Sequence, residues 1–459
     1  MVEQFDDVVL GGGKGGKSLA LALAKAGRSV ALIERGQIGG TCINVACIPT
    51  KTMVASAKLI EMARRASDFG VSLAPPPPDL TGVIARKRRV VGAMVDTHWA
   101  LFTTTPNLSF LLGEGVFTGE RTITVDLQDG STRVVRGERV YINTGSHTTV
   151  PPIPGLDTVD YLTSTSVMEL DELPERLAII GGGYIALEFA QVFRRLGSEV
   201  VVVQRGERFL PNEDTDIAAE IRKVLVEDGI EFLDNTDTDS VSPGVEGVEL
   251  RYSRNGDKGS LHCSHLMVAV GRTPSTAGLG LDAAGVQLDA RGAVAVNDRL
   301  ETSATNVYAI GDCNGGPLFT HASWDDYRIL LANVLHDARR STTGRLMPYT
   351  LFIDPELGRV GLTEEQAVSA GHDVAVATLP AKKIPRANTA GETTGVLKAV
   401  VDRATGQILG CSLFCHGAGE VMSVVQMAMI GNVPYWQVRD TVFTHPTMAE
   451  ALNLLFADL

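Results

Sequence analysis

The sequence predicts an α/β protein with two doubly wound, Rossmann-like nucleotide-binding domains followed by a third, α+β domain. Near the N-terminus an apolar strand, a glycine-rich turn, a helix and a second strand follow one another, and residues 177–204 repeat this pattern. Two such units in one chain indicate two dinucleotide sites, and hence hydride passing between two cofactors. After about Tyr349 the alternating stretches VLKAVVD and ILGCSLFC predict antiparallel strands, and a helix is expected around residues 421–429.

Length and composition agree with this fold class and exclude several functions. A chain of 459 residues is long enough for about three domains, each with its own core. The net charge of −13 argues against a nucleic acid or an anionic membrane as the main partner. No basic-then-apolar leader and no apolar run of roughly 20 residues is present, so a cytoplasmic protein is expected.

The first glycine turn has the features of a dinucleotide-binding loop. Gly11, Gly13 and Gly16 follow the strand at residues 8–10 and open a helix. The first glycine permits the tight turn, the second lets the backbone approach a pyrophosphate, and the third lets the helix pack close to the strand. Glu34 follows Gly16 by 18 residues at the end of the next strand, where a carboxylate binds ribose hydroxyls.

A cysteine pair, Cys42 and Cys47, follows that strand with four residues between the two thiols. This spacing is not a usual zinc pairing, and no second pair stands at a matching interval. Pro49 predicts a helix that begins near Cys47, and a helix N-terminus raises the thiolate fraction of a cysteine. Gly, Pro and Lys51 surround the pair, which favours a redox role over two buried thiols without consequence.

The string GGTCINVACIPTK resembles the redox-active signature of the class I pyridine nucleotide-disulfide oxidoreductases, and the resemblance covers nearly the whole chain. This family includes dihydrolipoamide dehydrogenase, glutathione reductase and mercuric reductase. The strings GKGGKSLA, INTGSHTTVPPIPG, ASWDDYRIL and VFTHPTMAEALNLLF look most like one branch. Its members are the bacterial reactive-chlorine-resistance flavoproteins, which are linked to oxidative stress and to reduction of copper(II) and hypothiocyanous acid.

The resemblance implies a role for each matching residue. Cys42 would be the interchange thiol and Cys47 the charge-transfer thiol of one redox-active disulfide. Lys51 would pair with Glu188 beside the flavin N5. Asp312, in the string NVYAIGDC, would hold the ribityl chain of FAD. The other residues that the matching strings assign to FAD binding are Gly40, Thr41, Gly145 and Gly311.

His445 and Glu450 are the expected acid–base pair. Thiol–disulfide exchange needs a group that moves a proton near pH 7, and a carboxylate five residues further on can orient the imidazole. The string HPTMAE follows VFT, which is strand-like. His321 is a second histidine of interest, either as a flavin contact or as the cap of a helix that starts there.

The second glycine turn, Gly181-x-Gly183-x-x-Ala186, follows the strand LAII and opens a helix. Alanine is allowed at the third position. The loop Gly271-Arg272-Thr273-Pro274 matches a family loop that follows a strand, and the residues themselves give it no role beyond chain geometry. We include Gly271 and Arg272 with the cofactor-binding residues.

Gln204 stands where a ribose-binding carboxylate is expected in the second unit, and Arg205 and Arg208 follow it. A carboxylate would repel a 2′-phosphate, whereas Gln with Arg accepts one. The sequence therefore predicts NADPH in preference to NADH. The alternative is that both arginines are solvated loop charges.

Three further features have a plain structural interpretation. Cys411 and Cys415 fall on one face of a predicted strand next to His416, which favours buried side chains over a metal site. The proline run at residues 75–78 predicts a stiff spacer. The amphipathic segment 80–102 carries the basic run 86–89, which is expected to be a solvated helix face.

The predicted domains are an FAD-binding domain at residues 1–150, completed by about 277–345, an NAD(P)H-binding domain at 151–276 and a dimerisation domain at 346–459. Electrons are expected to pass from NAD(P)H through FAD and Cys42–Cys47 to a small oxidant or metal ion. Rival functions are reduction of an organic disulfide or dihydrolipoamide, including service as a subunit of a larger complex. The absence of vicinal C-terminal cysteines and of an N-terminal metal-binding domain makes mercury a less favoured substrate. In the resembling family the protein is a homodimer whose subunits share the active site.

Overall fold

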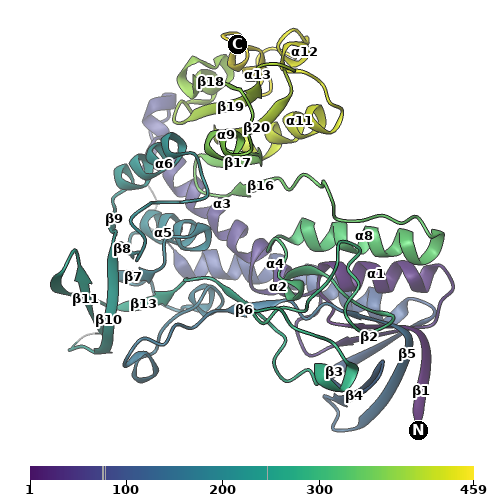
Figure 1. The fold of residues 1–459 in the computed structure, drawn as a ribbon. Coiled ribbons are helices and arrows are strands. Elements are labelled where there is room, and N and C mark those ends of the chain that lie inside the picture. The colour runs from purple at the N-terminus through teal and green to yellow at the C-terminus, as the bar shows by residue number, and fades with distance from the viewer. Residues whose placement is uncertain (75–76, 78, 246) are drawn as a thin grey trace. The chain divides into compact units, whose positions relative to one another are not determined.

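The computed structural model of the protein describes residues 1–74, 77, 79–245 and 247–459, which form two compact units (Figure 1). Unit 1 consists of Met1–Pro49, Ala85–Thr149 and Gly271–Arg345. Unit 2 consists of Thr50–Ile84, Val150–Val270 and Leu346–Leu459. Residues 75, 76 and 78 of the expected proline spacer lie outside the described residues. The three-domain division stays a prediction.

Unit 1 is built on a mainly parallel sheet. Its parallel strands lie in the order β3-β2-β1-β5-β15, and β4 pairs antiparallel with β3 and β5. Sequential strands on either side of β1 make this a doubly wound sheet. The strands are β1 (Val2–Leu10), β2 (Val30–Glu34), β3 (Leu108–Gly119), β4 (Thr122–Leu127), β5 (Thr132–Ile142), β15 (Val307–Ala309) and a small antiparallel pair, β6 (Ser146–Thr148) and β14 (Arg272–Pro274).

The long helices at residues 14–25 and 320–336 cover one face of this sheet, and the short helix at residues 281–284 packs on the other. Val9 points into a core with Leu19 of the first helix and Ile329 of a later one, whereas its neighbours Val8 and Leu10 pack into the core of the opposite face. This alternation is the period of a strand buried on both faces. The helices of unit 1 are α1 (Lys14–Lys25), α2 (Thr41–Asn44), α7 (Leu281–Ala284), α8 (Thr320–His336), the short turn η4 (Gly311–Asn314) and most of α4 (Leu80–Thr104).

The long helix α4 confirms the amphipathic segment and corrects one detail of its basic run. Arg86, Arg88 and Arg89 are exposed, as a solvated face requires, but Lys87 is buried. A helix turns by 100° per residue, so a run of four consecutive residues cannot all face solvent when one stripe of the helix packs inward. The run is therefore only partly a solvated face.

Unit 2 contains the second parallel sheet, in the order β13-β7-β8-β9. Helix α5 follows β7 and buries one side, as the glycine turn at residues 181–186 predicts. The elements are β7 (Arg176–Ile180), β8 (Glu199–Val203), β9 (Ile230–Leu233), β13 (His265–Val268), the antiparallel strands β10 (Thr236–Pro243), β11 (Val248–Arg254) and β12 (Asp257–Cys263), and the helices α3 (Cys47–Arg64), α5 (Tyr184–Leu196) and α6 (Thr215–Glu227).

The C-terminal part of unit 2 is a five-stranded antiparallel sheet in the order β16-β17-β20-β19-β18, packed against helices (Figure 1). It confirms the expected α+β character. Its elements are β16 (Tyr349–Leu351), β17 (Glu356–Gly361), β18 (Val374–Pro380), β19 (Val396–Asp402), β20 (Ile408–Cys415), α9 (Glu364–Ser369), α10 (Pro385–Ala390), α11 (Ala418–Ile430), α12 (Tyr435–Arg439) and α13 (Ala451–Leu455).

One expected element of this part is wrong. The strand expected at VFT, before His445, is not formed, and Val442 is fully exposed. The side-chain amide of Asn453 donates to the carbonyls of Val438, Arg439 and Thr441, at 3.2, 2.6 and 2.9 Å. These bonds fix the end of α12 and the turn after it, just before VFT. Val442 is exposed, so the VFT segment buries no apolar face of the kind that a strand needs. Elsewhere, none of the helices in the described ranges is both long and apolar enough to cross a membrane.

Candidate active site

The first glycine loop is shaped by contacts that only glycine permits. Gly11 has a φ of +107°, and a Cβ there would lie 2.2 Å from the carbonyl oxygen of Asn143. A Cβ on Gly16 would lie 2.2 Å from the carbonyl oxygen of Gly11. Asn143 fixes the loop, since its Oδ1 accepts from the Gly16 amide at 2.8 Å and its Nδ2 donates to the Ile310 carbonyl at 2.8 Å. The loop therefore presents the backbone N–H groups of the first turn of α1 to a phosphate group.

Glu34 ends β2 beside this loop, as expected. It is 7% exposed, and its carboxylate accepts from the amides of Gly12, Gly36 and Gln37 at 2.8, 2.9 and 3.0 Å. A Cβ on Gly13 would lie 2.9 Å from Asn143 Oδ1. A loop that cannot hold side chains, a helix N-terminus and a carboxylate at the next strand end fit the adenosine diphosphate half of FAD.

The two thiols lie at two helix starts. Cys42 is in the short helix α2, and Cys47 is the first residue of α3, so the helix predicted near Cys47 is confirmed. The Sγ of Cys47 lies 3.2 Å from the Oγ1 of Thr320, the first residue of α8. The hydrogen bond with Cys47 and burial raise the pKa of the Cys42 thiol, and the Thr320 hydroxyl and the charge of Lys17 lower it in part. Thr320 and Lys17 were not among the residues that the sequence suggested.

Asp312 belongs to a polar cluster in unit 1. The Ser146 hydroxyl donates to Asp312 Oδ2 at 2.5 Å, and Arg272 donates from Nε to Ser146 Oγ at 2.7 Å and from Nη2 to the Ser146 carbonyl at 2.6 Å. Arg272 thereby gains a role that its loop pattern did not supply, namely fixing the serine that binds Asp312. Burial lowers the pKa of Arg272, and the nearby Asp312 and Cys47 oppose this.

The remaining glycines of the predicted FAD site occupy special backbone positions. Gly40 has a φ of +85° and precedes α2, where a Cβ would lie 2.4 Å from the Cα of Gly13, so the two loops pack backbone to backbone. Gly145 and Gly311 also have positive φ, at +70° and +72°. Thr41, the first residue of α2, is half-buried.

Lys51 and Glu188 form the expected pair within unit 2. The Lys51 Nζ lies 2.9 and 2.7 Å from the two carboxylate oxygens, and the backbone amide of Phe352 donates to the same carboxylate at 3.0 Å. The ammonium lies 4.8 Å from the centre of the Phe352 ring. Lys51 stands four residues after Cys47 on α3. Its place beside a flavin stays a prediction.

The second glycine loop repeats the geometry of the first. Gly181 has a φ of +116°, and a Cβ there would lie 2.4 Å from the carbonyl oxygen of Ala269. Gly183 caps α5 with extended backbone, and no described atom lies within 4 Å of a Cβ added to it. Ala186 is buried against the sheet. Gly271, with a φ of +138°, is exposed.

Gln204 and the two arginines after it differ in how they are held. Gln204 is buried, and its Nε2 donates to the Gly206 carbonyl at 3.0 Å. Arg205 is exposed at the end of the sheet. Arg208 forms an ion pair with Glu365 at 3.2 Å. Arg205 is therefore the better candidate of the two for a 2′-phosphate.

The histidines of interest have distinct positions. His445 Nδ1 lies 2.8 and 3.0 Å from the two carboxylate oxygens of Glu450, and the His445 side chain is 67% exposed. His321 is the second residue of α8, whose capping position is Phe319, so His321 does not cap the helix. Its ring stacks on that of Phe319 with centroids 5.1 Å apart.

Cys411 and Cys415 are buried in β20, in agreement with the plain structural interpretation. Burial raises the pKa of the Cys415 thiol to about 12 and raises that of Cys411 as well. Such thiols are poor nucleophiles and poor metal ligands. In the part of the chain that the structure describes, no group of three or more His, Cys, Asp or Glu residues could hold a metal ion.

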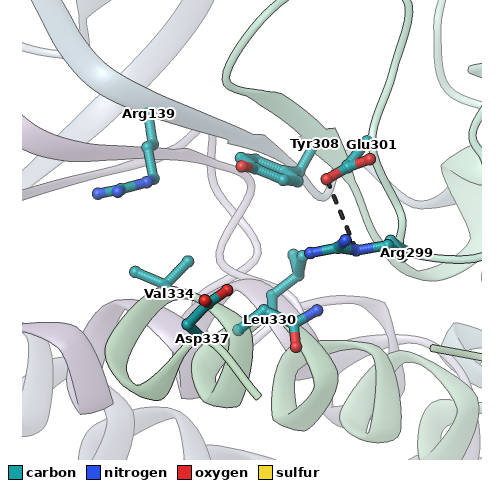
Figure 2. Close-up of a pocket in the computed structure, with 8 residues that line it drawn as sticks. Arg139, Arg299, Glu301, Tyr308, Leu330, Val334 and Asp337 are labelled. Atoms are coloured by element: carbon teal, nitrogen blue, oxygen red, sulfur yellow. Dashed lines mark ion pairs between the residues drawn. The ribbon is translucent and has the colours of Figure 1, made fainter. Parts of the chain in front are cut away.

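A pocket of about 190 Å³ in unit 1 does not coincide with the predicted site (Figure 2). Figure 2 shows Arg299 beside Glu301, its ion-pair partner at 3.8 Å, with Arg139 and Asp337 on the other side of the pocket, so the lining charges balance. Asp337 follows the last residue of α8, whereas the thiols lie near the first. A helix rises by about 1.5 Å per residue, so the pocket lies at the far end of α8 from Thr320.

Two dinucleotide loops, a thiol pair beside the first loop and an ion pair between Lys51 and the buried Glu188 define a flavin-linked disulfide oxidoreductase. Residues 5–326 match the pyridine nucleotide-disulphide oxidoreductase family, and residues 347–455 match its dimerisation domain. The chain belongs to this family, and its cofactors are FAD and a nicotinamide nucleotide.

Several relatives match nearly the whole chain. The probable pyridine nucleotide-disulfide oxidoreductase RclA of Escherichia coli is 40% identical over 99% of both chains. The mercuric reductase of Bacillus cereus is 34% identical over 98% of this chain and 70% of its own. The solved Cu(II) complex of the HOCl-induced flavoprotein disulfide reductase RclA from Escherichia coli has a TM-score of 0.92 at 40% identity, covering 100% of both chains.

Proposed function

We propose that this protein is an NADPH-dependent reductase that uses Cys42 and Cys47 to reduce a small oxidant or metal ion, with hypothiocyanous acid and copper(II) as the candidate acceptors. The observation that carries the proposal is the thiol pair in a chain that matches RclA, solved as a Cu(II) complex, from end to end. The mercuric reductases are less similar relatives.

The first half of the reaction prepares the thiols. The chemistry that bound FAD supplies is transfer of two electrons from the nicotinamide to the Cys42–Cys47 disulfide. The ion pair with Glu188 fixes the Lys51 side chain, which we expect to lie beside the part of the flavin that accepts the hydride. Thr320 donates or accepts at the Cys47 sulfur, which orients that thiol at the start of α3.

In the second half of the reaction the acceptor oxidises the two thiols back to the disulfide. The Cys42 thiolate attacks the sulfur of hypothiocyanous acid, a sulfur–sulfur bond forms, and the sulfur–oxygen bond breaks as the departing hydroxide takes a proton. The Cys47 thiolate then attacks the Cys42 sulfur, re-forms the disulfide and expels thiocyanate. The net reaction turns NADPH and hypothiocyanous acid into NADP⁺, thiocyanate and water. With copper(II), two ions take one electron each and one proton is released.

The acid for this step is His445 of a second copy of the chain, oriented by Glu450. Two observations support this: the dimerisation domain carries the pair, and His445 is well exposed in the single chain. A two-fold interface makes such an arrangement reciprocal.

The test is NADPH consumption by the FAD-loaded protein with a panel of acceptors: hypothiocyanous acid, copper(II), mercury(II), lipoamide and glutathione disulfide. Fast turnover on the first or second is expected, with loss of turnover in Cys42→Ser. Cys263→Ala, which removes a buried thiol of β12, serves as the matched control and should keep full activity. Far higher turnover on lipoamide or glutathione disulfide would overturn the acceptor class. Full activity of Cys42→Ser would overturn the thiol route.

A further inference from the structure

Lys17 is a buried cation in α1, the helix that follows the first glycine loop. It directly follows Gly16, and its side chain is 4% exposed in a helix whose other inward residues are apolar or glycine. Burial of a lysine charge is costly unless the ammonium finds polar partners. A buried charge near the start of a nucleotide-binding helix needs a specific partner.

Two groups hold the ammonium in place. The Lys17 Nζ donates to the Gly39 carbonyl at 3.1 Å and lies 2.8 Å from His98 Nε2. His98 Nδ1 lies 2.7 Å from the Met94 carbonyl, so Nδ1 carries the proton and Nε2 accepts from Lys17. Burial and the charges of Lys17 and Lys14 lower the pKa of His98, and its hydrogen bond with the Met94 carbonyl raises it in part; the net lowering favours the neutral imidazole.

Neither partner neutralises the charge. One is a carbonyl and the other a neutral imidazole, and none of the described carboxylates forms an ion pair with Lys17. An ammonium has three N–H donors, and the two bonds use two of them. Lys17 therefore has no anionic partner among the described residues of the chain.

Cys42, on the loop that Lys17 contacts through Gly39, is a group that becomes an anion when its thiol ionises. The charge of Lys17 lowers the pKa of the Cys42 thiol, and Cys42 raises that of Lys17 in turn. Burial lowers the pKa of Lys17 to about 8, with Lys14 acting in the same direction, so the ammonium still prevails at neutral pH. Gly39, which Lys17 contacts, lies three residues before Cys42 on the same loop. The charged and titratable groups that act on Lys17 are Lys14 and Cys42, and the group that accepts from it is His98.

We propose that Lys17, oriented by His98, is the positioning residue that stabilises Cys42 as a thiolate once the disulfide is reduced. The nucleophile that meets the oxidant is then activated by a cation of its own subunit. The acid His445 of a second copy is left to return the proton. The inference rests on the proposed role of Cys42 as the thiol that meets the acceptor, and it concerns only how that thiol is activated.

The experiment measures alkylation of the two-electron-reduced, FAD-loaded protein by iodoacetamide across pH, with the modified cysteine identified by mass spectrometry. Lys17→Met should raise the apparent pKa for Cys42 alkylation by about one unit, the low end of the effect of a nearby opposite charge. Lys17→Arg should stay close to the wild-type profile, since it keeps the charge. His98→Gln should give a smaller rise, and Lys25→Met, an exposed lysine at the end of the same helix, no change.

The outcomes separate this inference from the proposed function. An unchanged profile in Lys17→Met, with Cys42 labelled in the wild type, overturns the inference and leaves the proposed function intact. Labelling of Cys47 first in the wild type overturns the role of Cys42 and the inference with it. If Lys17→Met fails to retain FAD, His98→Gln decides: a raised pKa for Cys42 supports the inference, and an unchanged one overturns it.

Discussion

Cys42 and Cys47 have different surroundings, which favour the different tasks that we propose for them. Cys47 is the first residue of α3, where the helix N-terminus favours an anion. Cys42 lies in α2, where its pKa depends on Cys47 and on burial. A thiolate that the helix holds in place suits contact with a flavin, and the other thiol suits exchange.

The separation of tasks predicts opposite spectra for two serine variants. The Cys47→Ser protein should lose the long-wavelength band of the two-electron-reduced enzyme, because the thiolate that contacts the flavin is gone. The Cys42→Ser protein should keep a thiolate–flavin band. Anaerobic titration with NADPH, followed by absorption spectroscopy, measures both. The reverse pattern would mean that the two roles are exchanged.

Arg205 is the residue that should make the enzyme prefer NADPH. Arg205 is exposed beside Gln204. Gln204 stands in place of the usual carboxylate, which would repel a 2′-phosphate. Arg205→Ala should lower kcat/KM for NADPH by about tenfold, which corresponds to ~1.4 kcal/mol, and leave kcat/KM for NADH nearly unchanged.

Arg208→Ala is the matched control, because Arg208 is already paired with Glu365 on the surface. A surface ion pair contributes about 0–1 kcal/mol, so this variant should lose less than about fivefold in kcat/KM for NADPH. Steady-state kinetics with both nucleotides decides. A wild-type kcat/KM that is higher for NADH would refute the preference, as would unchanged NADPH kinetics in Arg205→Ala.

At the scale of elements, the two glycines of the second loop have different structural roles. Gly181 has a φ of +116° and a Cβ there would meet the Ala269 carbonyl at 2.4 Å, whereas Gly183 has a φ of −83° and no described atom within 4 Å of its added Cβ. The first is needed for the turn between β7 and α5. The second leaves open the space through which a pyrophosphate approaches.

Alanine at each position should therefore have a different effect. Gly181→Ala should destabilise the fold by at least about 1–3 kcal/mol, the cost of a strained backbone, and should abolish reduction by NADPH. Gly183→Ala should keep the melting temperature of the wild type and raise the KM for NADPH. Thermal denaturation and NADPH kinetics on the yellow protein measure both. Equal melting temperatures for the two variants would show that Gly181 is not needed for the turn.

The elements that the sequence predicts well are those in which local pattern and tertiary structure agree. The glycine turns predict α1 and α5, and the alternation of VLKAVVD predicts β19, because each pattern reports a face that the fold buries. The VFT segment forms no strand, and the chain just before it is held by Asn453, a residue of a later helix that no local pattern links to it. Long-range polar contacts are the part of the fold that a single sequence conceals.

The same limit applies to the candidate site. Lys51 with Glu188 was found through a resemblance, since 137 residues separate the two. Thr320 contacts Cys47 across 273 residues, and Lys17 contacts His98 across 81. The local signal for Lys17 was a charge at an inward-facing position of its helix, and the signal for Thr320 was its place next to His321.

At the scale of the whole molecule, the acid and the thiols belong to distant parts of the chain. His445 follows Cys42 by 403 residues and lies in the region that matches the dimerisation domain. The Cys42 site and the His445–Glu450 pair lie in different compact units. If His445 serves Cys42 of a second copy, a monomer should be nearly inactive.

Mixed dimers test this arrangement. Homodimers of Cys42→Ser and of His445→Ala should each be impaired. A heterodimer of the two would contain one intact site, with Cys42 from one chain and His445 from the other, and one site defective in both. It should recover about half of the wild-type activity, because a two-fold interface is reciprocal. If the subunits have exchanged and no activity returns, His445 acts within its own chain or does not act.

The result of the mixed-dimer test depends on whether reduction of the acceptor requires a proton. Reduction of hypothiocyanous acid releases hydroxide, so a proton donor speeds it, whereas transfer of single electrons to copper(II) needs no proton at the acceptor. His445→Ala should therefore slow turnover on hypothiocyanous acid by about 10²–10⁴-fold, the usual contribution of general acid–base catalysis, and slow copper(II) reduction much less. Parallel assays of one variant preparation with both acceptors separate the two cases. Equal losses on both acceptors would mean that His445 acts before the acceptor binds, when the disulfide is reduced.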